Sequence, residues 1–196
     1  MKKNLLLMFL LLNSVVAFGQ SSLKVKGYFG ISGTLAGPKQ ELTGSSSVTL
    51  DGFKEFGILV SKEFGQKFSI TGGVNYAWAD VDFSPNTPPG FLSLYVHNSE
   101  FRMLSIPAFA EYELGKIFYA AAGPLLDFQL SEGNNFSDQS GFGYLAGLGA
   151  RFGGEKLSFT VFPNYKRHSV IPFEKQEGAK DILQEFGIQL GVGYRF

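Results

Sequence analysis

Few residues in this 196-residue chain have the types and spacing that catalysis requires. His97 and Ser99 are the clearest candidates, separated by Asn98 alone. Residues two apart on a strand share a face, so the His97 imidazole could activate the Ser99 hydroxyl as a nucleophile. The pair therefore defines one candidate catalytic site.

Metal-binding chemistry has less support. His97 and His168 are the two histidines, and both fall in segments expected to be solvated external loops. A zinc site needs three or four convergent ligands. Asp80 and Asp82 could ligate Ca²⁺ together with loop carbonyls, but two carboxylates are too few for an organised calcium site. We expect no metal and no cofactor.

The composition excludes several functional classes. With 17 basic and 17 acidic residues, the chain cannot bind nucleic acid through bulk positive charge. It has no Cys, which excludes disulfide scaffolds, thiolate zinc sites and thiol catalysis. Charged residues make up 17%, against about 25% in soluble domains. The 25 glycines are nearly twice the usual share of about 7%. This low charge content and high glycine content disfavour a soluble enzyme.

Residues 1–19 have the pattern of a secretory signal peptide. Lys2 and Lys3 precede an apolar run over 5–12, and Ala17-Phe18-Gly19 supplies a small-x-small cleavage pattern. The run is shorter than the roughly 20 apolar residues of a transmembrane helix. We expect export of one domain, residues 20–196.

Hydrophobic alternation at period two dominates the rest of the chain, and 186–196 shows it most plainly. The even positions from Phe186 to Phe196 are all large and apolar, whereas the odd positions are Gly, Gln or Arg. Such alternation predicts strands with one apolar and one polar face. The pattern predicts eight strands: 23–35, 53–64, 67–78, 101–114, 118–130, 142–152, 157–166 and 186–196.

The connections alternate in length. Residues 36–52, 79–100, 131–141 and 167–184 form long links, and 65–66, 115–116 and 153–156 form short ones. Short periplasmic turns, longer external loops and an even strand number are typical of bacterial outer-membrane barrels. The sequence therefore predicts an all-β fold, an eight-stranded antiparallel up-and-down transmembrane β-barrel with both ends of the chain on the short-turn side.

The apolar face should contact lipid. About six large side chains per strand would overfill the narrow interior of an eight-stranded barrel. Glycines share the opposite face with charges that could pair inside the lumen: Lys26, Glu111, Asp127, Arg151 and Arg195. Leu59 and Phe162 interrupt the polar face, and Pro107 predicts a bulge or weakened pairing.

Aromatic residues of the apolar face gather at both strand ends, as in the interfacial belts of membrane barrels. One group lies near the short turns: Phe64, Phe68, Tyr112, Phe118, Phe152, Tyr194 and Phe196. The other lies near the long loops: Tyr76, Trp78, Phe128, Phe142, Tyr165 and Phe186.

Short motifs in the strands resemble known outer-membrane proteins. The alternating last strand ending in Phe196 resembles the signal that such barrels present to the barrel-insertion machinery. Leu104-Ser-Ile-Pro107, Ala122-Gly-Pro124 and Gly147-Leu-Gly149 resemble the L-x-I-P, G-P and G-x-G motifs of the PorT-like outer-membrane β-barrel family. This resemblance implies the outer membrane of a Gram-negative cell envelope. Family members vary in role, some serving protein secretion, so no catalytic residue is carried over.

A second resemblance gives an alternative function. His97-Asn98-Ser99-Glu100 resembles the H-x-S element of outer-membrane lipid A deacylases, which implies a lipid-modifying hydrolase. The wider pattern of that family is missing, and the predicted register places His97 and Ser99 on the lumen side. We therefore expect a non-enzymatic structural or interaction role carried by the external loops.

The expected partners follow from this location. They are outer-membrane lipid, the insertion machinery through Phe196, and a protein partner at loop 79–100. That loop is more apolar than solvation requires, which suits either a partner surface or a cap over the barrel mouth. Its apolar and proline residues are Phe83, Pro85, Pro88, Pro89, Phe91, Leu92, Leu94 and Tyr95.

Overall fold

The computed structural model describes residues 23–38, 47–84, 99–132, 136–154, 156–174 and 181–196. The predicted signal peptide, 1–19, lies outside the described residues. Within the described ranges, no helix has the length and apolar character needed to span a bilayer.

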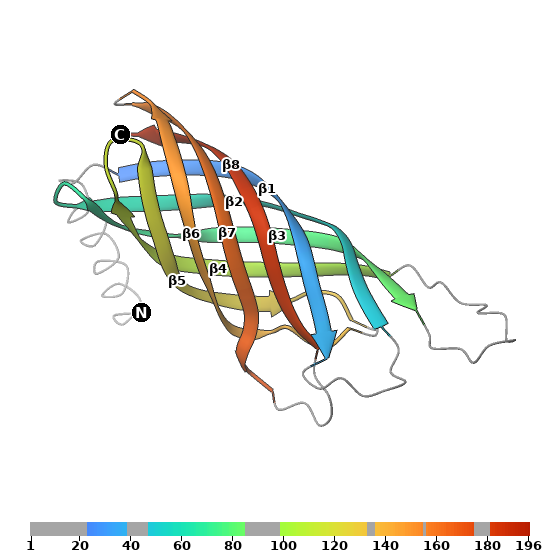
Figure 1. Ribbon diagram of the computed structural model, residues 1–196. Coiled ribbons are helices and arrows are strands. Elements are labelled where there is room, and N and C mark those ends of the chain that lie inside the picture. Colours follow the sequence, from blue (N-terminus) through green and yellow to red (C-terminus); the bar gives the residue numbers. More distant parts are fainter. Residues whose placement is uncertain (1–22, 39–46, 85–98, 133–135, 155, 175–180) are drawn as a thin grey trace, which may run out of the picture.

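Eight antiparallel strands close into a barrel in sequence order, and β8 pairs with β1 (Figure 1). The predicted fold is therefore confirmed. The strands are β1 (Leu23–Pro38), β2 (Ser47–Phe64), β3 (Phe68–Ser84), β4 (Ser99–Glu113), β5 (Phe118–Gln129), β6 (Gly141–Gly153), β7 (Leu157–Pro172) and β8 (Asp181–Arg195).

The short turns lie at the end of the barrel where β1 begins and β8 ends (Figure 1). The closing register runs from Lys24 opposite Arg195 to Pro38 opposite Asp181. Gly65 lies in the turn between β2 and β3 with a φ of 74°, in the left-handed region that favours glycine. The long connections lie at the opposite end, which corresponds to the extracellular side in a membrane barrel.

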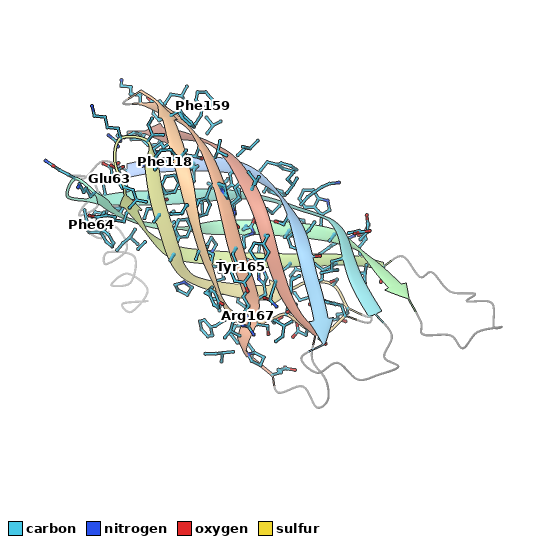
Figure 2. All side chains as sticks on the ribbon, viewed as in Figure 1. Glu63, Phe64, Phe118, Phe159, Tyr165 and Arg167 are labelled. Atoms are coloured by element: carbon cyan, nitrogen blue, oxygen red, sulfur yellow. The ribbon has the colours of Figure 1, made fainter. Side chains whose placement is uncertain are left out.

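Over most of the barrel the large apolar side chains point outward. On β8, Ile188, Leu190 and Val192 are 47%, 58% and 49% exposed, while Gln189 between them is buried. Figure 2 shows Phe64, Phe118 and Phe159 at the short-turn end and Tyr165 toward the other end. An outer face of this kind requires hydrocarbon as its solvent, because water would leave every one of these side chains hydrated.

The strands extend further at the long-loop end than the sequence predicts. We expected loops over 36–52, 79–100 and 167–184, but β1, β2, β3, β7 and β8 all continue into these segments. In the extensions of β2, β3 and β8 the polarity of the faces is reversed: Leu50, Val81 and Leu183 point inward and are at most 3% exposed. Asp51 and Asp80 are exposed on the outer face. The strands therefore rise into water, where the ordinary apolar-inside pattern applies.

Pro107 weakens pairing without causing a bulge. The β3–β4 pairing is interrupted between Ser105 and Ala108, and the register is the same on both sides. A proline has no backbone N–H to donate to the neighbouring strand. The register shifts of the barrel lie elsewhere, between Asp51 and Lys54 and between Phe142 and Tyr144.

Glycines on the inner face make room for rings that lie across the lumen. A Cβ at Gly149 would be 2.3 Å from Cζ of Tyr119, which is buried and stacks on Phe162 with ring centroids 5.6 Å apart. A Cβ at Gly57 would similarly be 2.6 Å from the Tyr28 ring. The glycine-rich face is thus required for a closed interior.

Gly149→Ala should destabilise the barrel, because the new methyl group would collide with the buried Tyr119 ring, which stacks on Phe162. We expect a loss of about 1–3 kcal/mol in the free energy of unfolding, measured by denaturant titration in detergent or lipid. Gly27→Ala is the matched control, since a Cβ there meets no atom within 4 Å. Equal stability of the two variants would contradict the close packing of Tyr119.

Candidate functional site in the barrel lumen

A buried network of ion pairs occupies the middle of the lumen. Lys166 on β7 lies between two carboxylates, with Nζ 2.6 Å from Oε2 of Glu55 and 3.2 Å from Oε2 of Glu185. All three side chains are at most 4% exposed. Asn75 and Gln189 donate further hydrogen bonds to Glu55, at 2.8 and 3.0 Å. The network thus joins β2, β3, β7 and β8 across the lumen.

His168 belongs to this network, which corrects the prediction that it lies in a solvated external loop. It is 1% exposed, and its Nδ1 lies 2.8 Å from Oδ2 of Asp127. Its Nε2 lies 2.7 Å from Oε1 of Glu185. Ionised carboxylates only accept hydrogen bonds, so both contacts are satisfied together when both ring nitrogens carry a proton. His168 therefore acts as a second cation beside Lys166.

The Asp127–His168 contact has the geometry that orients a general base in catalytic triads, but among the described residues no nucleophile completes it. In a triad, the second ring nitrogen faces a hydroxyl or thiol. Here it faces the Glu185 carboxylate. His168 therefore bridges two carboxylates, those of Asp127 and Glu185, and its second ring nitrogen is not available to a nucleophile.

A second network lies at the short-turn end. Arg151 on β6 contacts Glu111 and Glu113 on β4, with Nη to Oε distances of 2.5 and 3.0 Å. The Thr71 hydroxyl donates to the other Glu111 oxygen at 3.0 Å, and Arg195 pairs with Glu63.

The expected charge pairing inside the barrel is therefore confirmed for most of the named residues. Glu111 and Arg151 pair with each other, Asp127 pairs with His168, and Arg195 pairs with Glu63. Lys26 is the exception: it is 4% exposed and makes no ion pair with any described residue.

An apolar cluster closes the lumen at the long-loop end. Phe136, from the connection between β5 and β6, is 7% exposed and packs edge to face on Phe101, with ring centroids 5.6 Å apart. Gln139 in the same connection accepts a hydrogen bond from the Leu183 amide at 3.2 Å. The members of this cluster are Leu50, Phe53, Ala77, Ala79, Val81, Phe101, Met103, Phe136 and Leu183.

Sequence reasoning missed this cap. Phe136 lies between Asn and Ser residues with no alternation around it, so nothing in the pattern marks it as buried. Segment 79–100 was expected to be either a cap or a partner surface, and its residues 85–98 lie outside the described residues.

The residues selected for their chemistry are not brought together in the described part of the chain. Ser99 begins β4 opposite Val81 and lies two residues before Phe101, so it is on the inward-facing side of the strand. His97 lies outside the described residues. Asp80 is an exposed strand residue, not a loop residue. Asp82 is also in β3, but its side chain is not described. Among the described residues, no group of three His, Asp or Glu could hold a metal.

Comparison with known proteins shows the fold but no family. No protein-family model and no curated protein matches this chain. The outer membrane protein OprG from Pseudomonas aeruginosa has a TM-score of 0.57 at 15% identity, covering 90% of this chain and 96% of OprG. The outer membrane protein AlkL has a TM-score of 0.59 at 12% identity, covering 90% of each chain. The fold is that of small outer-membrane β-barrels.

Lys166→Met should be strongly destabilising, because it leaves the buried carboxylates of Glu55 and Glu185 without their shared cation. Removing one partner of a buried pair costs about 3–5 kcal/mol. Arg102→Met is the control: it breaks the exposed pair with Glu100, which should cost about 0–1 kcal/mol. Urea unfolding in lipid measures both variants. If Lys166→Met proves as mild as the control, the network does not stabilise the barrel.

Proposed function

We propose that this protein is a closed, non-enzymatic outer-membrane barrel with a structural or interaction role carried by its external loops. The observation that carries the proposal is the filled lumen. Two apolar clusters and two ion networks occupy it from the short turns to the long loops. Among the described residues, the lumen is blocked at its middle and at its long-loop end, so the barrel has to act through its surfaces.

The dimensions of the lumen argue against a channel. Among the described residues, the cavity near the middle has a volume of about 10 Å³, with Asn75, Ser105 and Asn164 in its wall. A space of roughly 10–15 Å³ holds a single water molecule. The ion pairs of Lys166 lie beside it and would have to break for a solute to pass.

The alternative is a lipid-modifying hydrolase that uses His97 and Ser99. Ser99 is on the same face of β4 as inward-facing Phe101, which is the lumen side. An acyl chain of a membrane lipid would approach the opposite, outer face. No described contact supplies Ser99 with a base or an oxyanion donor. The geometry therefore favours the interaction role.

The surface and the last strand support the remaining parts of the proposal. The exposed apolar band matches an outer-membrane location, and β8 presents its alternating outer face up to Phe196, as expected of a strand read by the insertion machinery. Membership in the PorT-like family rests on the three strand motifs. A partner would bind the loops, where 79–100 carries the apolar residues.

The refolded protein should form no steady open channel in planar lipid bilayers. Its lumen is closed by Phe136 and Phe101 at one end and by the Lys166 ion pairs in the middle. Single-channel recording measures this directly, with a large porin refolded by the same procedure as the positive control. Stable ion conductance at low voltage would contradict the closed lumen.

Deletion of residues 85–94 should abolish partner capture by crosslinking in intact cells while leaving the barrel folded. The segment contains six of the eight apolar and proline residues named for 79–100, and in the sequence it falls between β3 and β4. Heat-modifiable gel migration checks that the barrel remains folded. Deletion of 40–45, in the connection between β1 and β2, serves as the control. Unchanged crosslinks after the 85–94 deletion would place the partner surface elsewhere.

A further inference from the structure

The short-turn mouth of the barrel contains a cavity whose charged walls are all basic. It has a volume of about 160 Å³, well above the roughly 10–15 Å³ that one water molecule needs. Strands β1, β6, β7 and β8 and two short turns surround it. The charged side chains that line it are Lys24, Lys116, Arg151, Lys156 and Arg195.

Carboxylates near the cavity compensate only part of this charge. Glu111 and Glu113 pair with Arg151, and Glu63 pairs with Arg195. Figure 2 shows Glu63 at this end of the barrel.

Three lysines of the cavity wall lack such partners among the described residues. Lys24, Lys116 and Lys156 make no ion pair with any described residue. With Lys26, one inward position deeper than Lys24, the side chains in and around the cavity number six cations against three carboxylates. Glu155 lies outside the described residues and, if counted, leaves an excess of two cations.

Burial makes the uncompensated charge costly. Lys24 and Lys26 are 6% and 4% exposed, and an ammonium group removed from water without a counter-charge is strongly destabilising. Nε of Arg151, at the cavity wall, is also buried without a hydrogen-bond partner among the described residues. Spare donors and excess positive charge around one cavity are the features of an anion site.

The donor types and the depth of the cavity indicate which anion fits. A guanidinium with a free N–H and several flexible ammonium groups suits a tetrahedral oxyanion with several acceptor oxygens. Phe152 lines the cavity and is 50% exposed on the outer face, within the aromatic belt of this end. The cavity therefore borders the level at which phospholipid headgroups of the periplasmic leaflet lie.

We propose that this cavity is a phosphate-binding site at the periplasmic mouth, which holds a phosphate group between Lys24, Lys116, Arg151, Lys156 and Arg195. The group comes from a phospholipid headgroup or from a soluble phosphate ester. Its binding neutralises the buried lysines and anchors this end of the barrel. This site is independent of the external loops and of any partner they bind.

The test measures phosphate binding to the full, refolded chain by ³¹P NMR, in maltoside micelles titrated with inorganic phosphate and with short-chain phosphatidic acid. The charge-removal variant is Lys116→Gln with Lys156→Gln, because both residues lie in exposed turns where substitution leaves the strands intact. The matched control is Lys54→Gln with Arg102→Gln, which removes the same charge from the long-loop half of the barrel.

We expect both probes to shift on binding to the unmodified chain, and affinity to fall as salt is added. The turn variant should bind about tenfold or more weakly, as expected when two charge-assisted contacts are lost. The control should bind normally. Tighter binding of phosphatidic acid than of inorganic phosphate would identify a lipid headgroup, and equal binding a soluble ester. No binding at millimolar concentration, or equal weakening in both variants, would overturn the proposal.

Discussion

The middle of the lumen has to neutralise its own charges, because hydrocarbon surrounds the wall and the described residues leave water almost no room there. Charge excluded from the outer face is therefore concentrated where desolvation is most costly. Lys166 and His168 alternate with Glu55, Glu185 and Asp127, so each cation contacts two carboxylates. The network holds strands from opposite sides of the barrel together and also blocks the path through it.

The same constraint explains the change of polarity along the strands. Where lipid surrounds the wall, β4 points Ile106 and Tyr112 outward and Ser105 and Glu111 inward. Toward the long loops the same strand buries Phe101 and Met103 and exposes Arg102. In lipid the apolar side chains point outward, and in water they point inward. One continuous strand therefore has two opposite patterns of hydrophobicity. The apolar cluster around Phe136 is the ordinary core of the part that stands in water.

The sequence was sufficient for the fold because alternation at period two survives in every strand, and because glycine and charge occur on the same face. It was also sufficient to predict pairing between inward charges such as Arg151 and Glu111. It was insufficient where the solvent changes. The reversed pattern near Leu50, Val81 and Leu183 looked like loop sequence, so these strands were predicted too short. The strand over 157–166 was also ended too early, before Pro172, which placed His168 in water. The burial of Phe136 depends on a long-range contact with Phe101 that no local pattern encodes.

The central claim is that the solvent around the barrel changes along a single strand, and spin labels on β4 test it directly. The chain has no native Cys, so single cysteines at positions 100, 102, 106 and 108 can each carry one label. In lipid bilayers, labels at Ile106 and Ala108 should collide with oxygen, which concentrates in hydrocarbon. Labels at Glu100 and Arg102 should collide with a water-soluble nickel chelate. One uniform environment along all four positions would contradict the account.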